Sequence, residues 1–113
     1  MDAQEARELL ARERARIERA IVDAARPAGD EEGDVSDSAD VASQLLESEI
    51  DEGIARPLRE ELAAVERAER RLGEGTYGFS VDSGQPIADA RLRSIPWAER
   101  TAEEQAALEA GGA

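Results

Sequence analysis

The residues with the clearest capacity for chemistry are acids that crowd one stretch of the chain. Ten acidic residues and no basic one lie between Pro27 and Ala55. This density of negative charge would suit a basic channel, or a position near a metal ion held by a partner. The structural alternative is that Asp34 caps a helix and Asp37 lies in its first turn, where the helix dipole favours acids. Both interpretations can hold together. The ten acids are Asp30, Glu31, Glu32, Asp34, Asp37, Asp40, Glu47, Glu49, Asp51 and Glu52.

Two pairs of residues have the spacing of a zinc knuckle without its usual ligands. Ser80 and Ser83 are three residues apart, and so are Thr101 and Glu104. Neutral hydroxyls are poor zinc ligands beside thiolate or imidazole, and the chain contains no Cys and no His. We therefore expect no metal and no other cofactor, and we expect apolar packing in the place of a metal. The candidates for that packing are Tyr77, Phe79, Ile87, Leu92, Ile95 and Trp97.

Composition and missing motifs exclude several functions. The 113 residues carry a formal net charge of −13, from 27 acids and 14 bases. Such a surface repels phosphates and anionic membranes, so we expect no direct binding to nucleic acid and no membrane association. The motifs of P-loop, dinucleotide-binding, nucleophile-elbow and zinc-protease enzymes are absent, and a thin helical rod offers no deep pocket. We predict a cytoplasmic protein, without an export leader, that is not an enzyme.

Residues 2–25 are predicted to form the first of two long helices. Leu10 and Ile17 are seven residues apart on one apolar stripe, while Arg and Glu fill most other positions. Residues 26–36 follow as a connection rich in Gly and acids.

The second predicted helix is longer and runs from about Val35 to Leu72. Its apolar residues recur mostly three or four positions apart, which is typical of an amphipathic helix. Pro57 lies inside this pattern and removes one backbone hydrogen bond, so we expect a kink near Gly53–Arg56. Two helices joined by a short loop should fold back as an antiparallel hairpin.

The chain changes character after the second helix, which Gly73 and Gly75 are expected to end. In residues 76–87, aromatic and β-branched side chains alternate before an Asp-Ser-Gly turn signal. This pattern predicts two short strands around a tight turn. Residues 97–110 are predicted to form a short terminal helix.

Two motifs give the chain a resemblance to a known family over nearly its whole length. The more specific is Glu74-Gly75-Thr76-Tyr77-Gly78, followed by Ser83-Gly84-Gln85-Pro86-Ile87 and then Arg91-Leu92. The other is Asp34-Val35-Ser36-Asp37-Ser38-Ala39, which matches a DxxDxA motif. In this order, on a helical hairpin followed by a small finger, they resemble the DksA/TraR family of bacterial regulators that bind RNA polymerase.

The resemblance implies a mostly α fold. Residues 1–74 would form an antiparallel coiled-coil helical hairpin, with an acidic tip around 26–39. Residues 75–113 would form a small zinc-finger-like module, a short β-hairpin plus a C-terminal helix, that lacks zinc ligands. Ser80, Ser83, Thr101 and Glu104 occupy the four positions at which the family has cysteines.

The resemblance also implies a mechanism and a partner. Family members insert the hairpin into the secondary channel of RNA polymerase and alter the stability of promoter complexes without binding DNA themselves. Asp34, Asp37 and Ala39 match the tip residues that carry this effect. The acids would act electrostatically near the catalytic magnesium, and the small Ala would permit close approach.

Some members bind the alarmone ppGpp together with polymerase through basic side chains. The matching positions here hold Ala64, Ile95 and Gln105, none of them basic, so we expect little dependence on ppGpp. Family precedent implies a monomer.

Two other functions remain open at this point. The chain could be a helical protein–protein interaction module or self-associating coiled coil with no role at polymerase. It could also use the hairpin on a different machine that has a channel.

Overall fold

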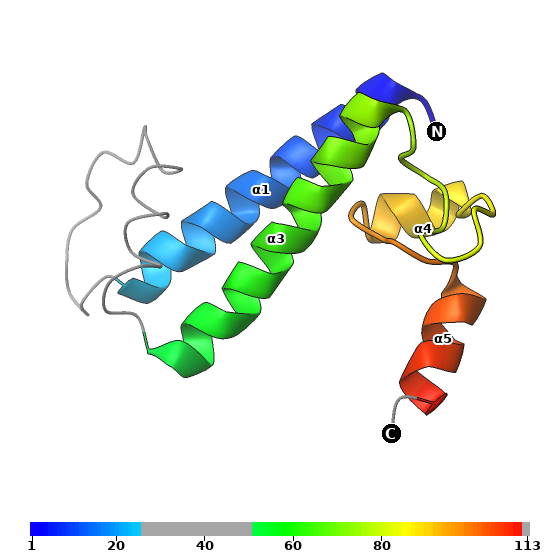
Figure 1. Cartoon of the computed structure of the whole chain (residues 1–113). Helices are drawn as coiled ribbons and strands as arrows, with labels where there is room; N and C mark the ends of the chain where they lie inside the picture. Colours follow the sequence, from blue (N-terminus) through cyan, green and yellow to red (C-terminus); the bar gives the residue numbers. More distant parts are fainter. Residues whose placement is uncertain (26–50, 112–113) are drawn as a thin grey trace. The chain divides into compact units, whose positions relative to one another are not determined.

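A computed structural model describes residues 1–25 and 51–111 of the chain (Figure 1). The elements in these ranges are helical: α1 spans Ala3–Ala25, α3 spans Glu52–Glu74, α4 spans Asp89–Ser94 and α5 spans Ala102–Gly111. The predicted mostly α fold is therefore confirmed. The expected connection over 26–36 and the acidic tip lie outside the described residues.

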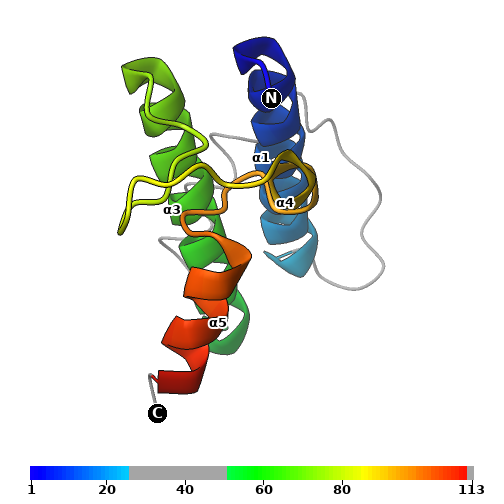
Figure 2. The ribbon, with the colours of Figure 1, turned by 90° about the vertical axis from the view of Figure 1, so that its right-hand side faces the viewer.

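Helix α1 forms as predicted and buries one apolar stripe. Leu10 is 1% exposed and Ile17 is 0% exposed. Helix α3 runs antiparallel to α1, since the first turns of α1 meet the last turns of α3 around Leu10 and Leu72, and Arg16 farther along α1 pairs with Glu61. Figures 1 and 2 both show the two helices side by side. The predicted helical hairpin is thus present in its two arms.

Helix α3 begins at Glu52, so the prediction of one helix running from about Val35 to Leu72 is wrong at this point. Asp51 lies just before the helix, and its side chain accepts a hydrogen bond from the Gly53 N–H at 2.8 Å. Its carbonyl accepts the N–H groups of Ile54 and Ala55, both at 2.9 Å. This is an N-cap arrangement. The predicted residues before Asp51 lie outside the described part of the chain.

The helix is continuous through Pro57, which lies in its second turn. A kink was expected near Gly53–Arg56, and α3 starts close to this point, at Glu52. The kink itself stays a prediction. A proline this close to a helix start disturbs fewer backbone hydrogen bonds than one in the middle.

The end of α3 depends on the backbone freedom of glycine. Gly75 has φ of 81°, a left-handed conformation that a Cβ disfavours. The Thr76 N–H donates to the Arg71 carbonyl at 2.9 Å, and the Gly75 N–H donates to the Leu72 carbonyl at 3.3 Å. This pair of bonds is a Schellman motif. Gly73 lies inside the last turn, so of the two glycines expected to end the helix only Gly75 does so.

Residues 78–87, called the knuckle turn from here on, replace the predicted pair of strands. The chain reverses direction here, but strand pairing among the described residues is limited to one isolated antiparallel bridge between Phe79 and Pro86. Two backbone bonds close the turn, from Ser80 N–H to the Gln85 carbonyl at 2.8 Å and from Ile87 N–H to the Gly78 carbonyl at 2.8 Å. The expected reversal was right and the regular strands were wrong. Pro86 contributes to this, because it has no N–H to extend a ladder.

The C-terminal part contains two short helices where one was predicted. Helix α4 was not anticipated; it is only six residues long and starts without a side-chain cap, which leaves little sequence signal. Helix α5 begins at Ala102 and not at residue 97, because Thr101 caps it. We call residues 75–111 the finger.

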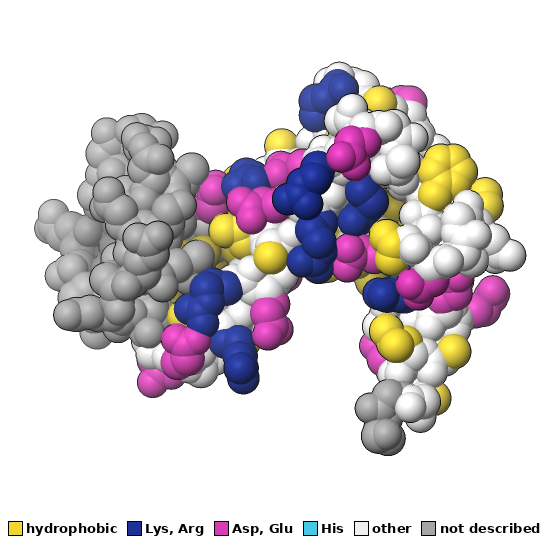
Figure 3. All heavy atoms as spheres, viewed as in Figure 1, with side chains coloured by type: hydrophobic (Ala, Val, Ile, Leu, Met, Phe, Trp, Pro, Cys, Tyr) yellow, Lys and Arg dark blue, Asp and Glu magenta, His cyan; other side chains and the backbone are white. Residues whose placement is uncertain are grey.

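The contacts divide the chain into two compact units. One contains Met1–Ala11 and Ala64–Ala113, and the other contains Arg12–Ala63. The finger and the ends of α1 and α3 thus belong to one unit, whereas the predicted domain boundary after residue 74 stays a prediction. Basic and acidic side chains are interspersed over the surface of α1 and α3 (Figure 3). None of the helices in the described residues is long and apolar enough to span a membrane.

Candidate functional site

The acidic tip is the first candidate site, and its key residues lie outside the described part of the chain. Asp34, Asp37 and Ala39 therefore stay predictions. Of the ten acids in the run, the structure describes Asp51 and Glu52. Asp51 is engaged as a helix cap, so at least this acid has the structural role that acidic helix starts commonly have.

The four positions that resemble a lost zinc site come together in the finger. The Ser80 hydroxyl oxygen accepts the backbone N–H groups of Asp82 at 3.1 Å and Ser83 at 3.2 Å. Ser80 is only 5% exposed. Its oxygen therefore holds the knuckle turn closed from inside, and the backbone groups of the turn are satisfied without a metal ligand.

The second pair forms a capping box at the start of α5. The Glu104 N–H donates to the Thr101 hydroxyl oxygen at 3.1 Å, and the Thr101 N–H donates back to the Glu104 carboxylate at 2.9 Å. This reciprocal arrangement satisfies two N–H groups that a helix start leaves unpaired. The spacing noted in the sequence is thus used for helix capping.

The Glu104 carboxylate joins the two pairs. Hydrogen bonds lower its pKa to about 2, and the largest contribution is the Ser83 hydroxyl, followed by the Thr101 backbone and the Ser80 hydroxyl. An ionised carboxylate that accepts several hydrogen bonds is favoured over its protonated form. We call these four residues, Ser80, Ser83, Thr101 and Glu104, the hydroxyl–carboxylate cluster.

The cluster does not fit a zinc ion. Three of its four side chains are neutral hydroxyls, and only one is a carboxylate, whereas zinc prefers thiolate and imidazole. Its hydroxyls already serve the knuckle turn, the α5 cap and the carboxylate. Within the described ranges, no group of three or more His, Cys, Asp or Glu side chains is placed to hold a metal.

Apolar residues also pack together in the finger, though they are not all the ones predicted. Ile87, Leu92 and Ala98 form the buried core, and Met1, Tyr77 and Ile95 pack against it. Phe79 was expected inside and is 47% exposed. Trp97, also expected there, is not part of this core and lines a hollow beside it, together with Ile95 and Ala98. Met1 and Ala98 were not predicted to be in this core, because neither lies within the segment 77–97 that contains the aromatic residues.

Tyr77 anchors the finger core through both ends of its side chain. Its ring packs on the core, and its hydroxyl donates to the Pro96 carbonyl at 2.8 Å. Burial raises the pKa of Tyr77 to about 12, because the phenolate is poorly solvated there. The neutral phenol is therefore the form that the folded finger holds.

A carboxylate that sequence reasoning missed connects the finger to α3. Glu99 accepts hydrogen bonds from Arg67 Nε at 3.0 Å, Arg67 Nη2 at 3.2 Å and Arg71 Nη1 at 3.1 Å. The hydrogen bond from Arg67 is the main reason why the pKa of Glu99 is lowered. Arg67 and Arg71 lie one turn apart on the same helix, a spacing that could have indicated a shared acceptor.

A second set of ion pairs connects the finger to the start of α1. Arg93 in α4 donates to Glu5 at 2.8 Å, and this bond lowers the pKa of Glu5. The amino group of Met1 contacts Asp89 at 3.0 Å. Together with the Glu99 contacts, these pairs fix the finger on the paired helix ends of its own unit.

The three positions matched to ppGpp binding line one hollow in this unit. Ala64, Ile95 and Gln105 share a space of about 320 Å³ with four charged side chains. Two of these are arginines, but Arg91 Nε donates to the Arg100 carbonyl and Arg100 Nε donates to Asp82. The remaining lining residues are Trp97, Ala98, Glu99 and Glu109. The hollow therefore contains both signs of charge.

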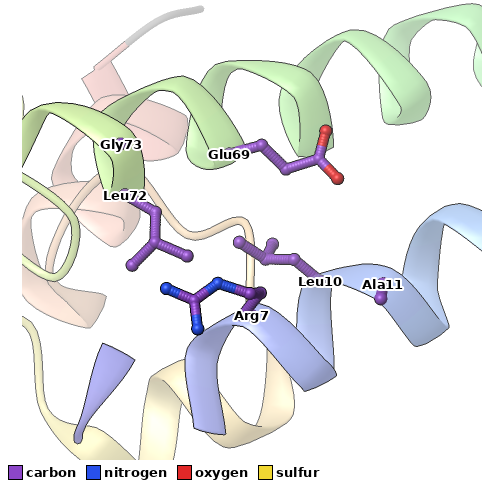
Figure 4. A pocket seen from close by; sticks show the side chains of 6 residues that line it. All are labelled: Arg7, Leu10, Ala11, Glu69, Leu72 and Gly73. Atoms are coloured by element: carbon purple, nitrogen blue, oxygen red, sulfur yellow. The ribbon is translucent and has the colours of Figure 1, made fainter. Parts of the chain in front are cut away.

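Another hollow, of about 300 Å³, lies between the ends of α1 and α3 (Figure 4). Leu10 and Leu72 form its apolar part, with Arg7 beside them and the Glu69 carboxylate directed away. Arg7 donates to the Gln4 side chain at 2.7 Å. The side chains that face this hollow are one cation and two leucines. They can contact another side chain, but they do not supply the nucleophile and base that a reaction needs.

Comparison with known proteins places these features in a family context. No family model matches the chain. It is 35% identical over 71 residues to General stress protein 16O of Bacillus subtilis, which is 63% of this chain and 44% of that protein. It is 31% identical over 70 residues to the RNA polymerase-binding transcription factor DksA of Caulobacter vibrioides, which is 62% of this chain and 49% of that protein. The chain thus spans about half the length of the curated relatives that it matches.

The fold comparison covers more of the chain. The structure of transcription factor DksA2 from Pseudomonas aeruginosa matches with a TM-score of 0.60 and 26% sequence identity. The match includes 97% of this chain and 84% of the DksA2 chain. The likeness therefore extends across both the helical arms and the finger.

Proposed function

Because the chain is DksA-like in sequence and in fold, we propose that it regulates transcription by binding RNA polymerase. The observation that carries this proposal is the fold match to DksA2 over 97% of the chain. Sequence identity of 31% to a protein named for RNA polymerase binding supports it. The general stress protein among the relatives supports a role in stress responses.

The mechanism we propose is insertion of the hairpin into the secondary channel of the polymerase. Asp34 and Asp37 would then act electrostatically on the catalytic region and change initiation, while Ala39 permits close approach. The charge distribution supports this assignment, since ten acids and no base lie between Pro27 and Ala55. A concentrated negative potential raises the affinity for a channel lined by basic groups.

In this proposal the finger positions the hairpin. Its unit contains the ends of both helical arms, joined to the finger by the Glu99 contacts on α3 and the Arg93–Glu5 pair on α1. Several ion pairs that share residues hold a geometry better than isolated ones. These contacts fix the finger on the base of each arm.

The proposal includes four further expectations. The protein is not an enzyme, because it would change the behaviour of polymerase and not transform a substrate. It does not bind nucleic acid directly, because its net charge of −13 repels phosphates. It acts as a cytoplasmic monomer. It depends little on ppGpp, since Ala64, Ile95 and Gln105 add no cation to their hollow and its two arginines have acceptors.

The test is binding to core RNA polymerase combined with transcription on the same samples. The variant to compare with the wild type is Asp34→Asn with Asp37→Asn, and the matched control is Glu103→Gln with Glu109→Gln on α5. Both double variants remove two negative charges. We expect all three proteins to bind polymerase, and only the tip variant to lose its effect on initiation.

Two results would contradict the proposal. Failure of the wild type to bind core polymerase at low salt would leave a DksA-like fold without the function. Equal effects of the tip variant and the α5 control on initiation would remove Asp34 and Asp37 from the mechanism. Measurement of molar mass in solution would then test the alternative of a self-associating coiled coil.

A further inference from the structure

Arg71, near the end of α3, has one terminal nitrogen without a hydrogen-bond partner. Its side chain is only 14% exposed, and its Nη1 donates to Glu99 at 3.1 Å. The other terminal nitrogen, Nη2, is buried and meets no acceptor among the residues that the structure describes. A buried N–H group without an acceptor is unfavourable, because it has lost water and gained no hydrogen bond in exchange. Arg71 therefore offers a donor that an acceptor from outside the chain can satisfy.

The positive charge of Arg71 is only partly balanced. Glu99 is shared, since it also accepts Arg67 Nε at 3.0 Å and Arg67 Nη2 at 3.2 Å. Arg67 thus contacts both oxygens of this carboxylate, whereas Arg71 contacts one of them. Two guanidinium groups around one carboxylate leave one positive charge in excess. Because the unpaired nitrogen belongs to Arg71, this side chain is where a further anion would be held.

Arg71 lines a hollow of about 610 Å³ beside the end of α3. Phe79 and Val81 contribute apolar side chains to the same hollow, and they are 47% and 48% exposed. A volume of this size is typical of sites for small molecules, which combine apolar walls with a few polar groups. The other lining residues are Glu74, Gly75, Thr76, Ser80 and Gly84.

The other polar side chains around the hollow contribute less to recognition. The Thr76 hydroxyl donates to the Arg71 carbonyl at 3.4 Å, and the Ser80 hydroxyl oxygen accepts two N–H groups of the knuckle turn. Glu74 opposes an anion, but it is exposed, and water screens an exposed charge more than a buried one. The chemistry of the hollow is therefore a guanidinium N–H beside apolar walls, which favours an anion that has an apolar part.

We propose that this hollow binds a small amphipathic carboxylate, with the carboxylate on Arg71 Nη2 and the apolar part against Phe79 and Val81. A guanidinium and a carboxylate form charge-assisted hydrogen bonds, which are stronger than neutral ones. Removal of two half-exposed apolar side chains from water adds to the affinity. The inference does not depend on binding to polymerase. Since the lining includes both α3 and the knuckle turn, the occupant stabilises the finger.

The experiment titrates the full chain, isotope-labelled for NMR, with sodium octanoate and follows the backbone amide signals. We expect saturable shifts at Gly75, Thr76, Val81 and Gly84, which line the hollow. Octanamide replaces the carboxylate by a neutral group, and acetate removes the apolar chain. Each of these analogues should bind about tenfold more weakly than octanoate, or weaker still. Octanoate should also raise the thermal midpoint of the finger.

Arg71→Met and Arg67→Met form a matched pair of variants on α3. Each removes one partner of Glu99, but Arg71 is among the residues that line the hollow and Arg67 is not. We expect Arg71→Met to bind octanoate about tenfold more weakly and Arg67→Met to bind it like the wild type. Glu74→Gln removes the opposing carboxylate. It should strengthen octanoate binding several-fold at low salt, with a smaller effect at high salt.

Three results would overturn the inference. The first is the absence of saturable octanoate binding to the wild type, and the second is equal affinity for octanoate and either analogue. The third is wild-type affinity in a folded Arg71→Met protein, where near-ultraviolet circular dichroism of Tyr77 and Trp97 reports folding. If Arg71→Met proved unfolded, octanoate binding by Glu74→Gln that is no stronger than that of the wild type would have the same consequence.

Discussion

The Arg12–Ala63 unit, which contains most of the paired helices, and the finger are held together in different ways. In the described part of the Arg12–Ala63 unit, burial follows an apolar stripe, with Ile17 and Ile21 both 0% exposed. The finger has a small core of three buried apolar residues and a polar cluster centred on Glu104. Helices can form from a repeated pattern, whereas the finger depends on a few specific hydrogen bonds. The finger should therefore be the region more sensitive to changes in polar residues and in pH.

The largest effect should come from removing a core side chain in either region. Leu92→Ala in the finger and Ile17→Ala in α1 should each lower the free energy of unfolding by about 2–5 kcal/mol, because a cavity adds to the lost burial. All three aromatic residues, Tyr77, Phe79 and Trp97, lie in the finger. Near-ultraviolet circular dichroism therefore reports on the finger, and far-ultraviolet circular dichroism reports mainly on the helices.

The two variants should differ in the order in which the near-ultraviolet and far-ultraviolet signals are lost as denaturant is added. Leu92→Ala should lose the near-ultraviolet signal at lower denaturant than the helical signal, and Ile17→Ala should not. Simultaneous loss of both signals in both variants would contradict the view that the two regions are held by separate means. Ile54→Ala, at a side chain that is 47% exposed, serves as a control and should change stability by less than about 0.5 kcal/mol.

A smaller effect is expected from Thr101. Thr101→Ala removes the oxygen that accepts the Glu104 N–H, and the loss of an N-cap costs about 1 kcal/mol. Thr101→Ser keeps the oxygen and should retain most of the stability. Denaturant titration followed by the Tyr77 and Trp97 signals would measure both. Equal stability of the Ala and Ser variants would show that the cap does not support the finger.

The smallest effect concerns the response of the finger to acid. The pKa of Glu104 in the folded chain is about 2, against a usual value of 4.5. A depressed pKa means that the stabilising contribution is complete above about 4.5 and is lost as the pH falls towards about 2. Because water competes at the surface, the contribution is modest.

Glu104→Gln should therefore make the stability of the finger less dependent on pH in that window. The measurement is the denaturation midpoint at several pH values between 5 and 2, with Glu103→Gln as the matched control on the adjacent residue. If the denaturation midpoint of Glu104→Gln changed with pH as steeply as that of the wild type, the Glu104 carboxylate would not contribute to the acid response of the finger.

Sequence patterns predicted the parts of the fold that repeat. The stripe of Leu10 and Ile17 located α1 to within a residue, because an amphipathic helix is specified by spacing alone. The end of the second helix was predicted at Leu72, about a half-turn before its observed end at Glu74, and its interruption at Asp51 was not predicted. An apolar pattern continues through Asp51, and only the capping bond to Gly53 shows that a helix begins there.

The chemistry of the hydroxyl–carboxylate cluster was only partly foreseen from the sequence. Ser80, Ser83, Thr101 and Glu104 were singled out by their zinc-knuckle spacing and matched to the family's cysteine positions, and the structure brings them together. Apolar packing was expected to replace the metal, whereas packing and a hydrogen-bonded carboxylate act side by side. The Glu99 contacts were missed because Arg67 and Glu99 are 32 positions apart, and the spacing of Arg67 and Arg71 can indicate a shared acceptor without identifying it.

The central structural claim is that the finger folds around the hydroxyl–carboxylate cluster without a metal. The most direct measurement is thermal unfolding of the finger, followed by the Tyr77 and Trp97 signals, in buffer containing a strong chelator and in buffer containing excess zinc. We predict the same midpoint in both and no zinc in the purified protein. A midpoint that rises with zinc, or loss of the near-ultraviolet signal in chelator, would contradict the claim, because metal binding contributes directly to folding wherever a site exists.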